Sequence, residues 1–258
     1  MRAVILAGGR GTRLLPYTTV LPKPLMPLGD RPIVEIIIGQ LRQHGFTDVT
    51  MAVGYLSHLM QAYFGNGERF GVQIRYSIEE QPLGTAGALT LIPDLTEPFL
   101  VMNGDVLTNL DFSDLYRYHC QQNAGITVSL YSKDVPIDLG VLELNQDSEV
   151  INYIEKPTFS YMVSMGIYVM SPEILGYFPR GQHMDLPDMV HRLLKERKKV
   201  AGYRCRGEWL DIGRPEDYAR ATAWVDALQL EQPSPSMFLV TPDRAPVMPL
   251  PAFDVERI

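Results

Sequence analysis

The stretch of this sequence whose residue types are best suited to binding a reactive ligand is a glycine-rich loop followed by two cationic side chains. Its glycines, Gly8, Gly9 and Gly11, come directly after a strand-like apolar run at residues 2–6. Glycines let a backbone turn tightly, and consecutive free N–H groups in such a turn form a concavity that binds anions. Arg13 adds a planar guanidinium that suits phosphate oxygens, and Lys23 adds a compact charge. Together they indicate a loop that binds a polyphosphate.

Two better-known phosphate loops do not fit this stretch. The dinucleotide fingerprint G-x-G-x-x-G begins correctly at Gly9 and Gly11, but Leu14 stands where the third glycine is needed for helix packing. The Walker pattern needs Gly-Lys-Ser/Thr to close the loop, and no such tripeptide follows. An ordinary glycine-rich turn remains the alternative, although Arg13 and Lys23 count against it.

Two carboxylates are candidate ligands for Mg²⁺. Asp105 ends a buried apolar strand predicted at residues 99–102, and magnesium usually takes one or two carboxylates plus substrate phosphates. Asp211 lies among apolar neighbours on a strand predicted at residues 208–212, where an acid is costly unless it is paired or bound to a cation. A turn aspartate at position 105, and a helix cap or salt bridge at position 211, are the structural alternatives.

Two further loops suit substrate binding. The small-residue segment 81–88 opens a predicted helix and could admit a planar base, with the amide of Gln81 reading the edge of that base. Glu155 and Lys156 close another predicted strand, where the lysine could hold a phosphate monoester and the glutamate could accept hydrogen bonds from sugar hydroxyls. The structural alternative for segment 81–88 is a tightly packed helix start. The alternative for Glu155 and Lys156 is an exposed charged pair at a turn.

Elements that alternate between strand and helix must position these residues. The pattern predicts an α/β fold in which helices cover both faces of a sheet and ligands bind at the carboxyl ends of the strands. Asp30 is expected to cap the first helix and Gly45 to close it. The second half is expected to continue the same sheet. The predicted strands are 2–6, 49–53, 73–77, 99–102, 126–131, 140–144, 150–154, 163–170, 200–205 and 208–212, and the predicted helices are 33–41, 59–64, 85–91, 186–198 and 216–230.

Composition excludes several classes of function. The 258 residues carry a net charge of −7, so no basic field exists to hold nucleic acid or an anionic membrane surface. Two cysteines are too few for a disulfide framework, no apolar run reaches about 18 residues, and the five histidines lack metal spacing. We therefore expect a cytoplasmic protein with one catalytic domain at residues 1–230 and a proline-rich tail at residues 231–258.

Taken in order, these motifs resemble those of the sugar-1-phosphate nucleotidylyltransferases, and most closely the members that act as mannose-1-phosphate guanylyltransferases. The resemblance runs from residue 2 to about residue 220. It implies a Rossmann-like three-layer sandwich with a mixed, mostly parallel central sheet. It also implies Mg²⁺-dependent transfer of a nucleotidyl group from an NTP to a sugar 1-phosphate, and a homo-oligomer, since many members of the family are oligomers.

The resemblance also implies a role for each matching residue. Arg13, Lys23 and Asp105 would be catalytic, with the two cations on the phosphates, and Asp105 and Asp211 would hold Mg²⁺. Gly140, Glu155 and Lys156 would bind the sugar phosphate. The residues implied to bind the nucleotide are Ala7, Gly8, Gly9, Gly11, Thr12, Arg13, Gln81, Gly84 and Gly87.

Departures from the family pattern leave the substrates open. Ser164 and Met165 stand where Asn-Ala is usual, and Leu139 replaces a common aromatic, so a less polar sugar than mannose is an alternative. UTP, dTTP or CTP with glucose 1-phosphate is a second alternative, and a catalytically silent homologue that senses nucleotide sugars is a third. Retention of Arg13, Lys23 and both aspartates disfavours the silent homologue.

Overall fold

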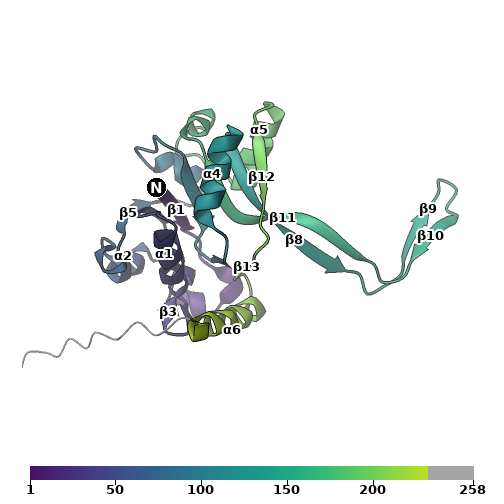
Figure 1. The fold of residues 1–258 in the computed structure, drawn as a ribbon, viewed down its shortest axis with the longest axis horizontal. Coiled ribbons are helices and arrows are strands. Elements are labelled where there is room, and N and C mark those ends of the chain that lie inside the picture. The colour runs from purple at the N-terminus through teal and green to yellow at the C-terminus, as the bar shows by residue number, and fades with distance from the viewer. Residues whose placement is uncertain (232–258) are drawn as a thin grey trace, which may run out of the picture.

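The computed structural model describes residues 1–231, so nearly all of the predicted proline-rich tail lies outside the described residues. A seven-stranded sheet forms the centre, in the order β12-β8-β11-β6-β1-β4-β5 (Figure 1). Its strands are β1 (Arg2–Ala7), β4 (Asp48–Val53), β5 (Gln73–Ile78), β6 (Phe99–Asn103), β8 (Ile126–Pro136), β11 (Thr158–Met170) and β12 (Val200–Arg204).

The sheet is mixed and mostly parallel, as predicted. β1 pairs in parallel with both β4 and β6, β4 pairs in parallel with β5, and β12 pairs in parallel with β8. Only β11 runs against its neighbours β6 and β8. The carboxyl ends of β1, β4, β5 and β6 therefore meet at one edge, where the loops with the predicted chemistry begin.

Helices cover both faces of the sheet, which confirms the predicted three-layer sandwich. The helices are α1 (Ile33–Gln43), α2 (Ser57–Phe64), α3 (Gly84–Gly87), α4 (Phe112–Gln122), α5 (Leu186–Lys195) and α6 (Pro215–Glu231). Alternate strand residues point to opposite faces, so Ile5 joins a core with α1, α2, α4 and α6 while its neighbour Val4 joins a second core with α3 and α5. Within the described residues, no helix is long and apolar enough to cross a membrane.

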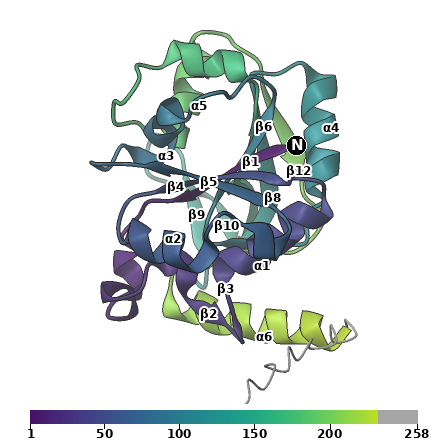
Figure 2. The same cartoon turned by 90° about the vertical axis from the view of Figure 1, so that its left-hand side faces the viewer.

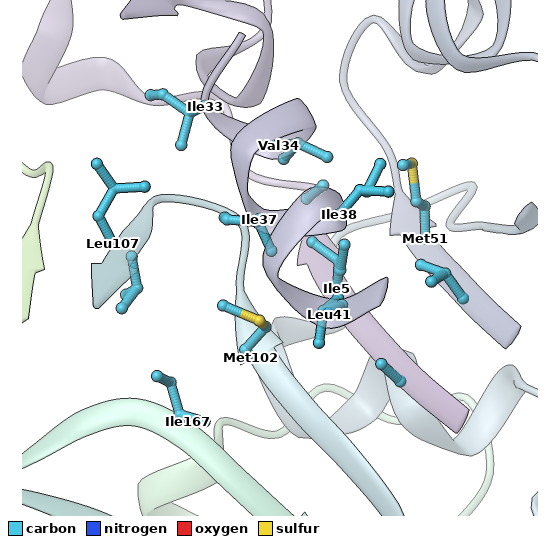
Figure 3. Packing of buried hydrophobic residues seen from close by; sticks show 14 of the residues in the cluster. Ile5, Ile33, Val34, Ile37, Ile38, Leu41, Met51, Met102, Leu107 and Ile167 are labelled. Atoms are coloured by element: carbon cyan, nitrogen blue, oxygen red, sulfur yellow. The ribbon is translucent and has the colours of Figure 1, made fainter. Parts of the chain in front are cut away.

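Helix α1 anchors the first of these cores. Ile33, Ile37 and Leu41 are fully buried against strand side chains such as Ile5 and Met102 (Figure 3). Burying each such side chain contributes about 1.5–3 kcal/mol. This packing fixes the carboxyl ends of β1 and β6 relative to each other.

The start of α1 differs from the prediction. Pro32, not Asp30, is the N-cap residue, because Arg31–Pro32 pairs as strand β3 with β2 (Pro27–Leu28) before the helix begins. Figure 2 shows α6 beside these two short strands, and the hydroxyl of Tyr218 donates to the carbonyl of Pro27. Gly45, at φ +81°, closes the helix as predicted.

Several elements were missed or misplaced by the sequence reasoning. Helix α4 was not predicted, although the Asp111 side chain caps it by accepting from the Asp114 backbone N–H at 2.9 Å. The predicted strand 208–212 forms as β13 (Trp209–Asp211), but it pairs with an unpredicted strand, β7 (Val106–Thr108), outside the main sheet. The predicted helix 85–91 is the short α3 followed by one 3-10 segment, Ala88–Leu91.

The second half of the chain continues the sheet only in part. β8 and β11 are longer than predicted and leave the body as a two-stranded ladder, which ends in a second hairpin of β9 (Val141–Leu144) and β10 (Val150–Ile154) (Figure 1). We call residues 132–163 the arm. In Figure 1 the arm reaches far from the helices and from the rest of the sheet.

A buried histidine makes the stability of the fold depend on pH. His119 is 1% exposed, and its ring nitrogens lie 2.8 Å from the Thr127 hydroxyl and 3.0 Å from the Ser171 hydroxyl. Burial lowers the pKa of His119, against a smaller opposing effect of Glu173. The unfolded chain therefore takes up a proton first as pH falls, so stability is complete above about pH 6.5 and declines below it.

We expect urea unfolding between pH 7.5 and 5 to show this decline, and His119→Gln to flatten it. His58→Gln provides the matched control, because His58 is exposed and should leave the slope unchanged. A pH profile that is the same with and without His119 would contradict the assignment.

Candidate active site

A cavity of about 330 Å³ opens at the carboxyl ends of the parallel strands. It lies where the sequence predicted a ligand, and its walls come from the ends of β1 and β6 and from the loops after β1 and β5. The predicted residues that line it are Ala7, Gly8, Gly9, Gly11, Arg13, Lys23, Gly84 and Asp105.

Two of the loop glycines, Gly8 and Gly11, lie close to neighbouring side chains. Gly11 adopts φ +63°, and a side chain there would meet Thr18 at 3.0 Å and Lys23 at 3.1 Å. Its carbonyl accepts hydrogen bonds from the Thr18 hydroxyl and from the Leu14 N–H, both at 2.9 Å, which hold the turn closed. A Cβ on Gly8 would lie 2.6 Å from Oε1 of Glu79. The turn therefore favours glycine at position 11, whereas a side chain at position 8 would require the flexible Glu79 carboxylate to move.

Lys23 and Asp105 form an ion pair on the floor of the cavity. Lys23 is 8% exposed because it lies on a short 3-10 turn, Lys23–Leu25, that is buried throughout. Its ammonium contacts Oδ2 of Asp105, and the other oxygen, Oδ1, is buried without a hydrogen-bond partner. A buried polar atom without a partner is uncommon and costly. The second oxygen is therefore free to accept a cation or a donor.

The fold brings Asp211 beside Asp105, which the sequence could not establish. Asp211 pairs with Val106 in the β13–β7 ladder, and the N–H of Ile212 donates to the Asp105 carbonyl at 3.0 Å. Burial raises the pKa of Asp211, and the neighbouring Asp105 raises it further, against the opposing effects of Lys23 and Arg13. Two carboxylates that disfavour each other's charge are stabilised by a bound cation.

Arg13 completes this group of charges. A side chain built at Gly213 would lie 3.1 Å from Nη1 of Arg13 and 3.6 Å from Oδ2 of Asp211, so the two groups converge at this point. The guanidinium belongs to an exposed residue and lines the cavity, where its fork can face phosphate oxygens.

The donor set fits magnesium bound together with a polyphosphate. Asp105 offers an unpartnered buried oxygen and Asp211 a second carboxylate, which matches the preference of Mg²⁺ for one or two protein carboxylates plus phosphate oxygens. In the part of the chain that the structure describes, no group of three or more His, Cys, Asp or Glu side chains is placed so that it could hold a metal ion.

Three predicted nucleotide residues lie outside the lining of the cavity. Thr12 and Gln81 are exposed. Gly87 is buried behind the cavity, where its N–H donates to the Met184 carbonyl at 3.0 Å, as expected for the structural alternative of a tightly packed helix start.

Other lining residues were missed by the sequence reasoning. Glu79 accepts the Leu83 N–H at 2.9 Å, and burial raises the pKa of its carboxyl group. Asp185 accepts the Thr85 N–H at 3.0 Å and so joins the start of α5 to the start of α3. Glu79 directly follows β5, so its position at a strand end was the signal that could have found it. Asp185 gave no such signal, because its hydrogen-bond partner Thr85 is 100 residues away in the sequence.

The residues predicted to bind the sugar phosphate lie on the arm and not in the cavity. Gly140 packs beneath Tyr153, whose hydroxyl donates to Glu155 at 2.6 Å, and Lys156 follows at φ +42°. The arm keeps these residues close to one another. Within one chain, it does not bring them to Asp105 and Lys23 (Figure 1).

The second loop of the cavity permits a direct test of its geometry. Gly84 adopts φ +72°, and a Cβ there would lie 2.5 Å from the Met184 carbonyl and 2.8 Å from Oδ1 of Asp185. Gly84→Ala should lower the free energy of unfolding by about 1–3 kcal/mol and displace the loop. Gly39→Ala in helix α1 is the control, since a Cβ there meets nothing within 4 Å and should stabilise the protein by about 0.5–1 kcal/mol. Equal unfolding midpoints for the two variants would contradict this geometry.

The chain is an α/β protein whose cavity, at the carboxyl edge of the sheet, is lined by a glycine-rich loop and by Arg13, Lys23 and Asp105. The chain belongs to the nucleotidyl transferase family, whose profile matches residues 2–227. This confirms the resemblance seen in the motifs.

Curated relatives support the same assignment. A UTP–glucose-1-phosphate uridylyltransferase from Synechocystis is 35% identical over 243 residues, which cover 86% of this chain and 62% of the relative. A mannose-1-phosphate guanyltransferase from Candida albicans is 32% identical over 231 residues, covering 86% of this chain and 64% of the relative. This chain thus spans somewhat less than two thirds of the length of either relative.

A solved structure shares the architecture over nearly its whole length. It is a Bacillus anthracis protein, provisionally assigned as a glucose-1-phosphate thymidylyltransferase and solved with sucrose. It superposes with a TM-score of 0.71 at 28% identity and covers 87% of this chain and 95% of the other.

Proposed function

We propose that this protein transfers a nucleotidyl group from an NTP to a sugar 1-phosphate and releases pyrophosphate. The observation that carries the proposal is that Lys23, Arg13 and Asp105 line the same cavity as the glycine-rich loop, with Asp211 just outside that lining and close to Asp105. Two cations and two neighbouring carboxylates suit a polyphosphate that arrives with Mg²⁺.

The reaction needs no protein nucleophile. An oxygen of the sugar phosphate, already anionic, attacks the α-phosphorus; the new P–O bond forms as the bond between the α-phosphorus and the bridging oxygen breaks, and pyrophosphate leaves with that electron pair. The protein must bring two anions together and stabilise the charge that develops. We assign charge stabilisation to Lys23 and Arg13, and orientation of the sugar phosphate to Lys156.

Asp105 and Asp211 would hold the magnesium ion. When bound, the ion would neutralise phosphate charge and orient the triphosphate. Lys23 pairs with Asp105, and this pairing explains how a lysine can be buried at this position.

Our first choice of substrates is GTP with mannose 1-phosphate or heptose 1-phosphate. Similarity to the Candida albicans guanyltransferase and the Gly84–Gly87 segment support it. UTP with glucose 1-phosphate is the second choice, favoured by the 35% identity to the Synechocystis uridylyltransferase.

Both cysteines are free thiols, which fits our proposal of a cytoplasmic location.

The decisive experiment measures pyrophosphate release with Mg²⁺. It crosses GTP, UTP, dTTP, CTP and ATP with the 1-phosphates of mannose, heptose, glucose and N-acetylglucosamine. Turnover with one pair would establish the reaction and identify both substrates. Absence of turnover with every pair, together with calorimetric binding of a nucleotide sugar, would instead support a silent sensor.

A further inference from the structure

Tyr55, on the loop between β4 and α2, contacts the glycine-rich loop and the turn that follows it at three points. Its backbone N–H donates to the Gly8 carbonyl at 3.3 Å, and its hydroxyl donates to the Thr19 carbonyl at 2.8 Å. The centre of its ring lies 5.7 Å from the Arg10 guanidinium. One residue outside the loop therefore joins the start of the loop to the turn at its far end.

Residues 15–20, which follow the glycine-rich loop, have little else to hold them. Only Thr18 among them is buried, and their three large hydrophobic side chains are more than half exposed. Within the described chain, the bond from Tyr55 to Thr19 is the only hydrogen bond that ties residues 15–20 to a residue outside the range 8–25. A segment with so little buried surface opens at a low cost in free energy.

Arg13 lies between two points at which this part of the chain is held. Before it, the Gly11 carbonyl accepts the Thr18 hydroxyl at 2.9 Å; after it, Tyr55 holds the carbonyl of Thr19. Arg13 is exposed and lines the cavity, so the place of its guanidinium depends on the backbone that carries it. Movement at Thr19 would therefore displace Arg13 and the N–H groups of the loop together.

We propose that Tyr55 is a positioning residue, whose hydroxyl holds the glycine-rich loop and residues 15–20 in the shape that binds the triphosphate. This inference rests on the proposed function, which places the phosphates of the NTP on this loop. Tyr55 is not among the residues that line the cavity, so it acts through the loop. A ligand's apparent Kd rises in inverse proportion to the fraction of protein in the binding shape. Saturating nucleotide restores that shape, so the effect falls on nucleotide affinity and not on kcat.

Tyr55→Phe tests the proposal with the smallest change, since it removes the hydroxyl and keeps the ring beside Arg10. Binding of GTP or UTP with Mg²⁺, measured by calorimetry, should weaken by about three- to tenfold, as expected for one lost hydrogen bond. The KM for the NTP should rise by the same factor. Both kcat and the KM for the sugar 1-phosphate should change by less than about twofold. A merely structural role would lower the urea midpoint and leave nucleotide affinity unchanged.

Tyr118→Phe is the matched control. The Tyr118 hydroxyl also donates to a backbone carbonyl, that of Gly202 at 3.1 Å, but this bond joins α4 to β12. The variant should leave nucleotide affinity and both KM values unchanged. An equal loss of affinity in Tyr118→Phe and Tyr55→Phe would show a general effect of destabilisation and would overturn the proposal.

Hydrogen exchange tests the loop without using activity. The backbone N–H groups of Leu14, Leu15 and Thr19 donate to carbonyls of the same segment, so their exchange reports how often it opens. In Tyr55→Phe they should exchange about three- to tenfold faster than in the wild type, and bound nucleotide should remove the difference. Exchange equal to that of the wild type, or faster exchange with unchanged affinity, would overturn the proposal. A wild type that binds neither nucleotide would instead contradict the proposed function, on which this inference rests.

Discussion

Lys23→Ala should lower kcat by about two orders of magnitude, the cost typical of removing one preorganised charge stabiliser. Lys23 is buried at the floor of the cavity, so neither solvent nor a flexible neighbour can replace its ammonium. Steady-state pyrophosphate release with the preferred substrate pair would measure the effect. Arg10→Ala is the matched control, because Arg10 belongs to the same loop but is exposed, with its guanidinium 5.7 Å from the Tyr55 ring. It should cost less than about fivefold.

Loss of fold must be separated from loss of chemistry in this variant. Removing Lys23 leaves the Asp105 carboxylate without its partner, which destabilises a protein by about 3 kcal/mol when the pair is buried. The double variant Lys23→Ala/Asp105→Asn removes both charges, so its urea midpoint should return toward that of the wild type while turnover stays low. A stable double variant with normal turnover would exclude Lys23 and Asp105 from the mechanism.

The second large effect concerns the paired carboxylates. Asp211→Asn should reduce kcat by about 100-fold and raise the Mg²⁺ concentration needed for half-maximal turnover by at least about tenfold, because a neutral amide is a poorer ligand for a hard cation. The thermal shift produced by Mg²⁺ with NTP should shrink in parallel, which gives a readout that does not depend on catalysis. Chelation of magnesium with EDTA should abolish turnover in the wild type.

Asp217→Asn controls for charge alone. Asp217 is close enough to raise the pKa of Asp211, but it lies on α6 and its effect is smaller than that of Asp105. It should change turnover by less than about threefold. An Asp211→Asn variant with an unaltered magnesium requirement would remove Asp211 from the metal site.

Local sequence patterns predicted the parts of the fold that depend on short-range physics. The strands β1, β4, β5 and β6 and helix α1 follow from their apolar patterns, and the role of Gly45 in closing α1 follows from its place after the helix. The order of strand and helix then predicted a mostly parallel sheet, and the rule for such sheets located the cavity at their carboxyl ends. Helix α4 carries local signals of its own, a cap at Asp111 and buried residues Phe112, Leu115 and His119 at helical spacing, and the sequence reasoning did not use them.

By itself, the sequence determined that a glycine-rich loop, followed by Arg13 and Lys23, comes directly after the first strand. It also determined that Asp105 follows a later strand and that Asp211 lies on another. Backbone freedom and charge are properties of the residues themselves, so they can be read without coordinates. Only the tertiary structure decided which groups meet. Asp211 reaches Asp105 through the pairing of β13 with β7, while Glu155 and Lys156 are carried away by the ladder of β8 and β11. These outcomes depend on pairing between segments distant in the chain, and no local pattern encodes that pairing.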